Sequence, residues 1–299
     1  MLALTHRPAF STVTELFKPI TWFPPMWAFA CGVVASGVEM QGKWLLAVVG
    51  VLLAGPFVCA TSQAVNDWYD RHVDAINEPM RPIPSGRMPG QWGFYIAVLW
   101  TVISMLVATV LGFWGFCAAL VGLLLAWAYS APPIRLKENG WWGNAACGFS
   151  YEGIAWATGA AVMAGGVMPD SRSLVLALLY SIGTHGIMTL NDFKAVEGDR
   201  QMGVRSLPVQ LGVQNAGRVA CGVMILSQVV VVALLLTWGK PIHAASIAAL
   251  MAAQLVMMRR FLASVTERAL WYSGFGVPLF VAGMMVSAFA LRGLIQAPV

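Results

Sequence analysis

Charged residues are scarce in this 299-residue sequence, where Asp, Glu, Lys and Arg together make up only 10%. A soluble globular domain carries roughly 25% of these residues, so the composition argues against a soluble fold. Hydrophobic residues account for 59%, and apolar stretches long enough to cross a bilayer recur from end to end. The sequence therefore predicts an all-α, polytopic bundle of membrane-spanning helices in one domain, 1–299.

Cysteine is also scarce, and its arrangement excludes a disulfide framework or a zinc site. The five cysteines all lie inside apolar segments, and none belongs to a C-x-x-C pair. We interpret them as small core residues. A removable signal peptide is not indicated either, because no convincing small-residue cleavage site follows the first apolar run.

Hydropathy, with glycine, proline and charge as punctuation, predicts nine membrane spans. The predicted ranges are 20–38, 44–65, 92–111, 113–130, 144–167, 173–190, 219–237, 243–258 and 270–291. The third and fourth spans are separated only by the turn at 112–115. The lipid bilayer is thus the first expected partner of the chain.

Basic residues are distributed unevenly between the two sides of this predicted bundle. With the N-terminus inside, the outer side has only Lys43, Arg172, Lys240 and Arg292, and the inner side has the other fourteen. By the positive-inside rule, the N-terminal segment 1–19 and the loops 66–91 and 191–218 face the cytoplasm. This distribution also explains the net charge of +5 without a nucleic-acid partner. The inner residues are Arg7, Lys18, Arg71, Arg81, Arg87, Arg135, Lys137, Lys194, Arg200, Arg205, Arg218, Arg259, Arg260 and Arg268.

Two acidic motifs repeat along the chain. Asn66-Asp67-Trp68 with Asp74 matches Asn191-Asp192-Phe193 with Asp199, so each pair of equivalent residues is about 125 positions apart. This offset covers four predicted spans, which suggests a duplicated four-helix unit with one added span. Both motifs then lie on the same face of the membrane. A transporter with inverted repeats and charges at mid-membrane is the alternative, and this arrangement disfavours it.

The spacing of the acids in the first motif suits a divalent cation. Asp67, Asp70 and Asp74 are separated by three and four residues, so on a helix they share one face. Mg²⁺ prefers a few carboxylates combined with waters and phosphate oxygens. Two such half-sites facing each other would hold a diphosphate bridged by metal ions. A single cluster is equally compatible with solvated loop acids, and it is the repetition that favours a site. The predicted metal ligands are Asp67, Asp70, Asp74, Asp192, Glu197 and Asp199.

Basic and polar residues around the motifs are candidate phosphate ligands. Arg81, Lys194 and Arg205 lie within or beside the two motifs. For any single one of these cations, membrane orientation is an equally good explanation. The predicted diphosphate-binding residues are Asn66, Arg81, Tyr129, Lys137, Asn191 and Arg205, and the predicted catalytic residues are Asp67, Asp70, Asp192 and Lys194.

Three further titratable residues lie in or near predicted spans. Glu152 falls inside the fifth span, where an unpaired carboxylate is costly, so it needs a partner or a role. A structural hydrogen bond is the favoured interpretation. His72 and His185 could ligate a metal, although a packed or hydrogen-bonded histidine is the more common situation.

The motifs resemble those of the UbiA superfamily of membrane prenyltransferases. The segment from Asn66 to Gly86 reads N-D-W-Y-D-R-H-V-D-A-I-N-E-P-M-R-P-I-P-S-G, and its I-N-E-P-x-R-P-I-P-S-G part is similar to the chlorophyll and bacteriochlorophyll synthase branch. The same branch is matched by N-D-F-K-A-V-E-G-D-R from Asn191, G-V-R-S-L-P-V-Q-L-G from Gly203 and Y-S-A-P-P-I-R-L-K from Tyr129.

This resemblance implies a nine-helix bundle whose active site opens toward the cytoplasm. It implies Mg²⁺-dependent transfer of a prenyl group from geranylgeranyl or phytyl diphosphate to the propionate of a chlorophyllide-type tetrapyrrole. It also implies an integral protein of a bacterial inner or photosynthetic membrane. By position, the residues that would hold Mg²⁺ and diphosphate are Asn66, Asp67, Asp70, Asp74, Asp192 and Asp199. Many superfamily members have an aspartate where this chain has Ala195, so its second motif depends on Asp192, Glu197 or Asp199.

Another acceptor is compatible with the acidic motifs alone. A prenyltransferase acting on a quinone precursor or on haem would use the same diphosphate chemistry. The I-N-E-P-x-R-P-I-P-S-G match is what favours the tetrapyrrole. Protein partners in pigment biosynthesis are left open by the sequence.

Overall fold

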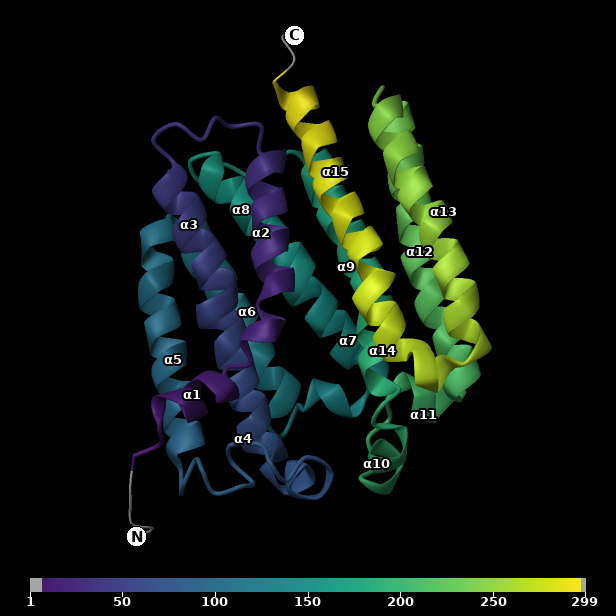
Figure 1. Cartoon of the computed structure of the whole chain (residues 1–299). Helices are drawn as coiled ribbons and strands as arrows, with labels where there is room; N and C mark the ends of the chain where they lie inside the picture. Colours follow the sequence, from purple (N-terminus) through teal and green to yellow (C-terminus); the bar gives the residue numbers. More distant parts are fainter. Residues whose placement is uncertain (1–6, 297–299) are drawn as a thin grey trace.

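The computed structural model describes residues 7–296. Residues 1–6 of the predicted N-terminal segment, and residues 297–299, lie outside the described part. Helices pack side by side into one bundle (Figure 1), as predicted for an all-α membrane fold. In chain order the helical elements are α1 (Phe10–Leu16), η1 (Pro19–Thr21), α2 (Phe23–Ala35), α3 (Trp44–Leu52), η2 (Leu53–Cys59), α4 (Ala60–Asn77), α5 (Trp92–Ala108), η3 (Thr109–Leu111), α6 (Gly112–Ser130), η4 (Leu136–Glu138), α7 (Gly140–Gly148), η5 (Phe149–Ile154), α8 (Ala155–Met163), α9 (Ser171–Asp192), α10 (Val196–Gln201), α11 (Leu207–Leu211), α12 (Val213–Thr237), α13 (Pro241–Ala263), α14 (Val265–Phe275) and α15 (Val277–Ile295).

Every predicted span corresponds to helical structure. In chain order the spans coincide with α2, α3 to α4, α5, α6, α7 to α8, α9, α12, α13 and α14 to α15. Within residues 7–296, six helical stretches are individually long and apolar enough to cross a membrane. One of them, Trp92–Ser130, contains both the third and the fourth predicted spans. Gly112, with a φ of 72° that only glycine adopts easily, separates α5 from α6, which pack against each other.

Two spans contain a stretch of wider, π-type helical turns. In the second span this stretch is η2, around Pro56, whose ring cannot continue a regular helix. In the fifth span it is η5, between α7 and α8. Wide turns of this kind re-aim the side chains that they carry and are frequent at functional sites.

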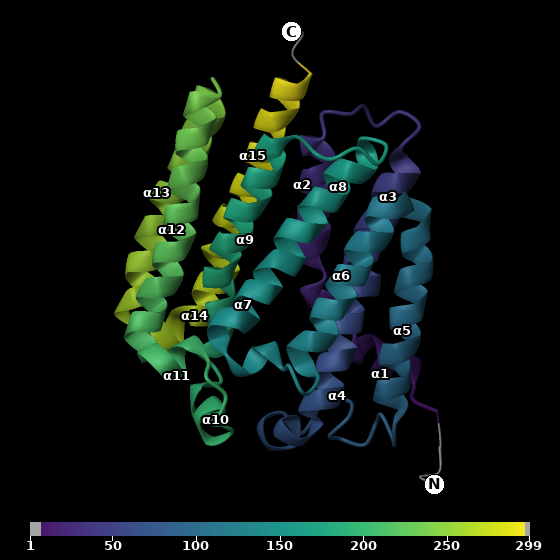
Figure 2. The ribbon, with the colours of Figure 1, turned by 180° about the vertical axis from the view of Figure 1, so that it is seen from behind.

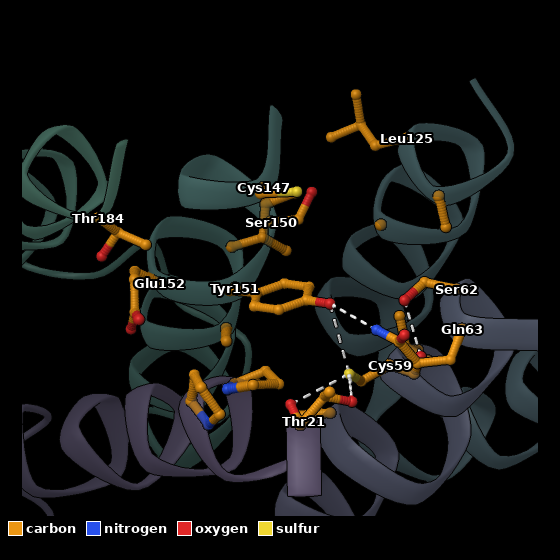
Figure 3. Close-up of a pocket in the computed structure, with 18 of the residues that line it drawn as sticks. Thr21, Cys59, Ser62, Gln63, Leu125, Cys147, Ser150, Tyr151, Glu152 and Thr184 are labelled. Atoms are coloured by element: carbon orange, nitrogen blue, oxygen red, sulfur yellow. Dashed lines mark hydrogen bonds between the residues drawn. The ribbon is translucent and has the colours of Figure 1, made fainter. Parts of the chain in front are cut away.

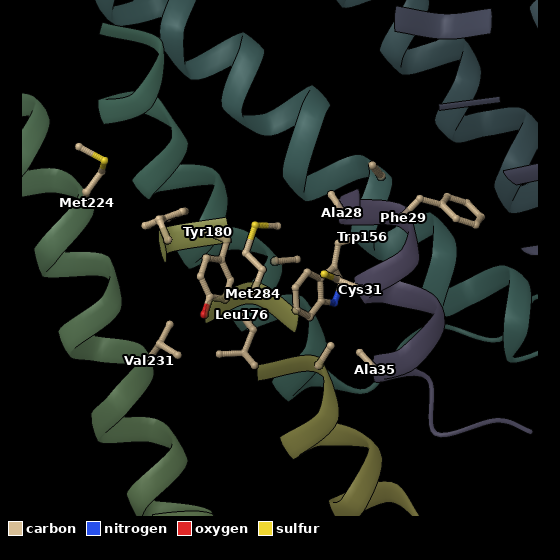
Figure 4. Packing of buried hydrophobic residues seen from close by; sticks show 14 of the residues in the cluster. Ala28, Phe29, Cys31, Ala35, Trp156, Leu176, Tyr180, Met224, Val231 and Met284 are labelled. Carbon is tan, nitrogen blue, oxygen red and sulfur yellow. The ribbon is translucent and has the colours of Figure 1, made fainter. Parts of the chain in front are cut away.

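Glycines allow neighbouring helices to approach backbone to backbone. A Cβ atom at Gly32 would overlap the carbonyl oxygen of Trp156, and one at Gly159 would overlap that of Phe29, so α2 and α8 are in direct contact. Small residues at membrane helix interfaces permit such close packing. The core beside this contact is aromatic (Figure 4): Trp156 stacks on Tyr180 with ring centroids 5.9 Å apart. These contacts join α2 and α8 to α9, the helix that leads to the second motif.

Both acidic motifs lie at the same end of the bundle. The C-terminal ends of α4 and α9 lie there, together with α1, α10 and α11 (Figures 1 and 2). The opposite end contains the starts of α3, α9 and α13 and the end of α15, which carry the four basic residues assigned to the outer side. The shared location agrees with the repeat. The compartment that each end faces stays a prediction from the charge pattern.

Candidate active site at one end of the bundle

A cavity of about 610 Å³ connects the motif end of the bundle with its apolar interior. Its size falls within the usual range for small-molecule sites, roughly 300–1,000 Å³. The polar end is lined by Lys18, Asn66, Arg81, Tyr129, Asn191 and Lys194. The interior end is lined by apolar and small residues that include Phe29, Leu53, Ala118, Ala119 and Ala155. The cavity therefore combines a charged mouth with a chamber suited to hydrocarbon.

The first motif lies on α4, which continues to Asn77, beyond the predicted end of the second span at 65. The helical spacing puts its carboxylates on one face, as predicted. Asp67 is only 1% exposed and accepts a hydrogen bond from Lys18 at 2.5 Å. Arg81 bridges the motif, at 2.9 Å from Asp74 and 3.5 Å from Asp67. Lys18 and Arg81 line the cavity themselves, so the cations lie between the carboxylates and the space.

Asp70 joins the first motif to the loop between α6 and α7. Its carboxylate pairs with Lys137 and accepts a hydrogen bond from the amide of Asn66 at 2.9 Å. Arg135 approaches it to 3.8 Å. Burial lowers the pKa of the Lys137 ammonium, and the Asp70 carboxylate counteracts part of that effect. The loop from Tyr129 to Lys137 thus lies against the first motif, with Tyr129 lining the cavity and Lys137 outside its lining.

Backbone strain coincides with two of these ion pairs. In the described part of the chain, the non-glycine residues with positive φ are Lys18, at 46°, and Arg135, at 38°. Long side chains rarely adopt this conformation, which costs on the order of 1–3 kcal/mol. Each of the two residues pairs with an aspartate of the first motif, Lys18 with Asp67 and Arg135 with Asp70. Strain concentrated in this way is typical of a functional site.

The second motif differs from the first in that its helix is broken. α9 ends at Asp192, and Asp199 belongs to the separate short helix α10. The spacing of seven residues between Asp192 and Asp199 predicts that both acids project from the sixth span, and this prediction is wrong because they lie on separate helices. Their charges nevertheless remain close enough to interact. Burial raises the pKa of the Asp199 carboxyl. Glu197 is exposed and pairs with Arg200 on its own helix, 3.3 Å away.

The two motifs meet around the cavity mouth. Tyr129 lies near both Asp70 and Asp192, and Asn191 and Lys194 line the same cavity as Asn66. The backbone at Arg205 donates to the Glu138 carbonyl and accepts from Gly140, both at 2.8 Å. These bonds tie the third loop to the second motif. The Arg205 side chain is exposed and does not line the cavity, so its predicted phosphate contact has no support from this arrangement.

The donor set fits a divalent cation that is completed by a ligand. Asp67 Oδ2 and Asp192 Oδ2 are both buried and lack a hydrogen-bond partner among the described residues. Each motif therefore has one unsatisfied carboxylate oxygen. Burial of such an oxygen costs free energy unless another group binds to it. Between residues 7 and 296, no three His, Cys, Asp or Glu side chains converge into a preformed metal cluster. Such an open arrangement suits Mg²⁺, which takes only one or two carboxylates together with substrate phosphates and waters.

Comparison with known proteins identifies the family. The model of the "UbiA prenyltransferase family" matches residues 21–277. The chain belongs to the UbiA prenyltransferase family. It is 58% identical over 284 residues to "Bacteriochlorophyll synthase 33 kDa chain" of Cereibacter sphaeroides, a match that covers 95% of this chain and 94% of the relative. Its counterpart in Rhodobacter capsulatus is 51% identical, over 93% of this chain and 92% of that protein.

A solved UbiA structure has the same fold. The structure of a UbiA homolog from Archaeoglobus fulgidus bound to GPP and Mg²⁺ superposes with a TM-score of 0.65, at 18% identity, and covers 94% of this chain and 99% of that chain. The UbiA fold therefore confirms the predicted all-α membrane bundle. Family membership as a prenyltransferase also decides against the transporter alternative.

Several polar residues of this UbiA cavity gave no signal in the sequence. Tyr151 accepts hydrogen bonds from Gln63, at 3.3 Å, and from the Cys59 thiol, at 3.6 Å (Figure 3). Cys59 and Gln63 lie on the second span and Tyr151 on the fifth, and none of the three belongs to a motif. Lys18 was recognised only as an inner charge, because its partner Asp67 is 49 positions away. The two histidines are elsewhere: His72 is exposed, and His185 lies against Trp141 with ring centroids 5.6 Å apart.

Proposed function

We propose that this protein transfers a geranylgeranyl or phytyl group from its diphosphate to the propionate carboxylate of a chlorophyllide or bacteriochlorophyllide, in a reaction that depends on Mg²⁺. The observation that carries the proposal is the 58% identity, over nearly the full length of both chains, to a bacteriochlorophyll synthase. The cavity supports it, because it joins an apolar chamber to a mouth that can bind phosphate.

The mouth of the cavity binds the diphosphate. The mouth is lined by three cations, Lys18, Arg81 and Lys194, whose positive charge attracts the phosphate oxygens. The side-chain amides of Asn66 and Asn191 donate hydrogen bonds to the diphosphate. The carboxylates of Asp67, Asp70, Asp74, Asp192 and Asp199 would hold Mg²⁺ together with diphosphate oxygens. When bound, the metal would supply positive charge that stabilises the departing diphosphate.

The reaction exchanges one carbon–oxygen bond for another. The bond between C1 of the prenyl group and the bridging diphosphate oxygen breaks, and its electron pair leaves with the diphosphate. A propionate oxygen donates a pair to C1 and forms the ester. Because a propionate is already ionised at neutral pH, this acceptor needs no general base. Lys18, Arg81 and Lys194 stabilise the negative charge that gathers on the leaving group.

The apolar chamber protects the reacting carbon. Leu53, Ala118, Ala119 and Ala155 line the interior of the cavity and exclude water from the prenyl chain. Water would otherwise capture an allylic cation and give an alcohol in place of the ester. The same apolar surface holds the tail in the membrane interior, where its hydrocarbon is soluble.

The protein is integral to the membrane. We assign it to a bacterial inner or photosynthetic membrane, with the motif end in the cytoplasm, on the strength of the positive-inside distribution. Both substrates suit this location. The diphosphate reaches the charged end from water, and the tail and the pigment partition into lipid.

Isolated membranes provide the test. Membranes that contain the protein are given geranylgeranyl or phytyl diphosphate, Mg²⁺ and each pigment in turn, and esterified product is measured by chromatography. Esterification of a chlorophyllide-type acceptor is expected, and reaction with only a phenolic acceptor or haem would refute the proposal. The matched control is Glu39→Gln, which removes an exposed carboxylate outside the motifs and should leave turnover unchanged.

A further inference from the structure

Glu152 is a buried carboxyl group that the reaction described above does not use. It is 3% exposed, lies in the wide turns of η5 and lines the cavity. Its Oε2 atom has no hydrogen-bond partner among the described residues, and no Lys, Arg or His of residues 7–296 forms an ion pair with it. The structural hydrogen bond expected from the sequence is therefore not found for this oxygen, and the polar neighbour of the carboxyl group is Thr184.

Thr184 on α9 faces the same part of the cavity (Figure 3). Threonines in membrane helices usually donate to the carbonyl one turn earlier, as Thr61, Thr158 and Thr189 do here. Thr184 makes no such bond: its Oγ1 is buried beside the Glu152 carboxyl group and has no well-formed hydrogen bond within the described chain. Two unsatisfied polar groups from different spans thus line one region of an otherwise apolar wall.

The two groups are held on a rigid scaffold. A Cβ atom at Gly153 would come within 2.6 Å of Ser181 Oγ, and one at Gly148 within 2.5 Å of the Ser181 carbonyl oxygen. η5 and α9 are therefore in direct contact one turn before Thr184. Close contact of this kind leaves little freedom for Glu152 to turn away and find another partner.

The chemistry of the two substrates, the prenyl diphosphate and the pigment, decides which of them contacts Glu152 and Thr184. An isolated carboxylate in the membrane interior is very costly, so Glu152 is a neutral carboxyl group and a hydrogen-bond donor. A prenyl chain offers only carbon and hydrogen, and it would leave both polar groups unsatisfied. A tetrapyrrole macrocycle carries carbonyl groups on its edge. The pair therefore marks the part of the cavity that receives the pigment.

The position along α9 selects the carbonyl. Thr184 precedes Asp192 by eight residues, and a helix rises about 1.5 Å per residue, so the pair lies about 12 Å from the acidic end. The ring ketone of these pigments is next to the propionate, which must reach that acidic end. The acetyl group of a bacteriochlorophyllide lies on another pyrrole, farther from the propionate. A chlorophyllide carries a vinyl group at that position, which cannot accept a hydrogen bond.

We propose that Glu152 and Thr184 form a specificity subsite that donates hydrogen bonds to the acetyl carbonyl of a bacteriochlorophyllide acceptor. The subsite rests on the proposed function, and it identifies the acceptor more closely. Neither residue takes part in bond making. Both position the macrocycle so that its propionate reaches the diphosphate end.

Steady-state kinetics with a matched pair of pigments test this subsite. The pair consists of two chlorophyllides that are identical except for an acetyl or a vinyl substituent at the one position, each esterified with geranylgeranyl diphosphate in membranes. For the wild-type protein, KM for the acetyl pigment is expected to be about 100-fold lower than KM for the vinyl pigment, because two hydrogen bonds contribute about tenfold each. Thr184→Val and Glu152→Leu should raise KM for the acetyl pigment about tenfold and leave the vinyl pigment unchanged.

Conservative and control variants separate this role from a structural one. Glu152→Gln keeps a neutral donor and should retain the preference for acetyl, and Thr237→Val, which removes a distant exposed hydroxyl, should have no effect. The subsite is overturned if Thr184→Val retains the full preference, or if KM for the prenyl diphosphate is the quantity that changes. If the wild-type protein esterifies neither pigment, the proposed function itself is wrong.

Discussion

Replacing Asp67 with asparagine perturbs the best-connected carboxylate of the site. The change keeps the shape of the side chain and removes its charge. Asp67 is 1% exposed and holds Lys18 at 2.5 Å, and Arg81 is at 3.5 Å. Arg81 would keep Asp74 and Glu78 as partners, but Lys18 would lose the one ion pair it makes within the described chain.

The expected cost has two separable parts. Breaking a largely buried ion pair destabilises a protein by about 3–5 kcal/mol, and the lower end applies because Lys18 retains some exposure, 23% of its side chain. Loss of one proposed metal ligand should cost transition-state stabilisation of similar size. About 3 kcal/mol corresponds to roughly a 100-fold fall in kcat/KM.

Two measurements on two variants distinguish these parts. Thermal unfolding in detergent reports stability, and pigment esterification at matched protein concentration reports activity. Adding Lys18→Met to Asp67→Asn removes the unpaired positive charge that the single variant leaves on Lys18. The double variant should therefore recover part of the lost stability and none of the activity. A metal-binding role for Asp67 is refuted if Asp67→Asn alone keeps activity within about threefold of wild type, or if the double variant regains turnover.

Three further outcomes follow from the site and the packing. Chelation of divalent cations should abolish esterification, and added Mg²⁺ should restore it; activity that survives exhaustive chelation contradicts the assignment of the acids. Asp192→Asn should lower kcat/KM about 100-fold, whereas Glu197→Gln should stay within threefold because Glu197 is exposed and pairs with Arg200; equal losses would contradict this ranking. Gly159→Ala should lower the unfolding temperature, since its methyl group would overlap the Phe29 carbonyl; an unchanged unfolding temperature would show that α2 and α8 can separate at little cost.

The sequence predicted those features of the fold that depend on regular patterns. Long apolar runs fix the spans, and an offset of four spans between the motifs puts both at one end of the bundle. Local spacing likewise predicted the shared face of Asp67, Asp70 and Asp74, because the three acids lie on one uninterrupted helix.

The break in the second motif could not be predicted from local sequence. Residues 193–200 include no proline, and Ala195 favours a helix. The chain leaves α9 where Phe193, 2% exposed, packs against Phe261 of α13 with ring centroids 5.9 Å apart. That contact joins segments far apart in the sequence, so tertiary packing overrides the local preference.

The polar lining of the cavity was equally hidden from the sequence. Lys18 reaches Asp67 through a strained backbone at the end of α1, and no propensity rule favours a positive φ for lysine. Tyr151 and Gln63 meet across two spans that each read simply as apolar. The cost of a carboxyl group in the membrane singles out Glu152 in the sequence, whereas its neighbour Thr184 is defined only by the packing of α9 against η5.

The central claim is that carboxylates from both motifs share one metal-bound diphosphate at the mouth of the cavity. Anomalous diffraction from crystals grown with Mn²⁺ and a non-reactive thiolo analogue of geranylgeranyl diphosphate would locate the metal directly. Anomalous peaks are expected in contact with Asp67 or Asp70 on α4 and with Asp192 at the end of α9, with the analogue's tail in the apolar chamber. Peaks that contact only one of the two motifs, or a diphosphate bound outside the cavity, would contradict it.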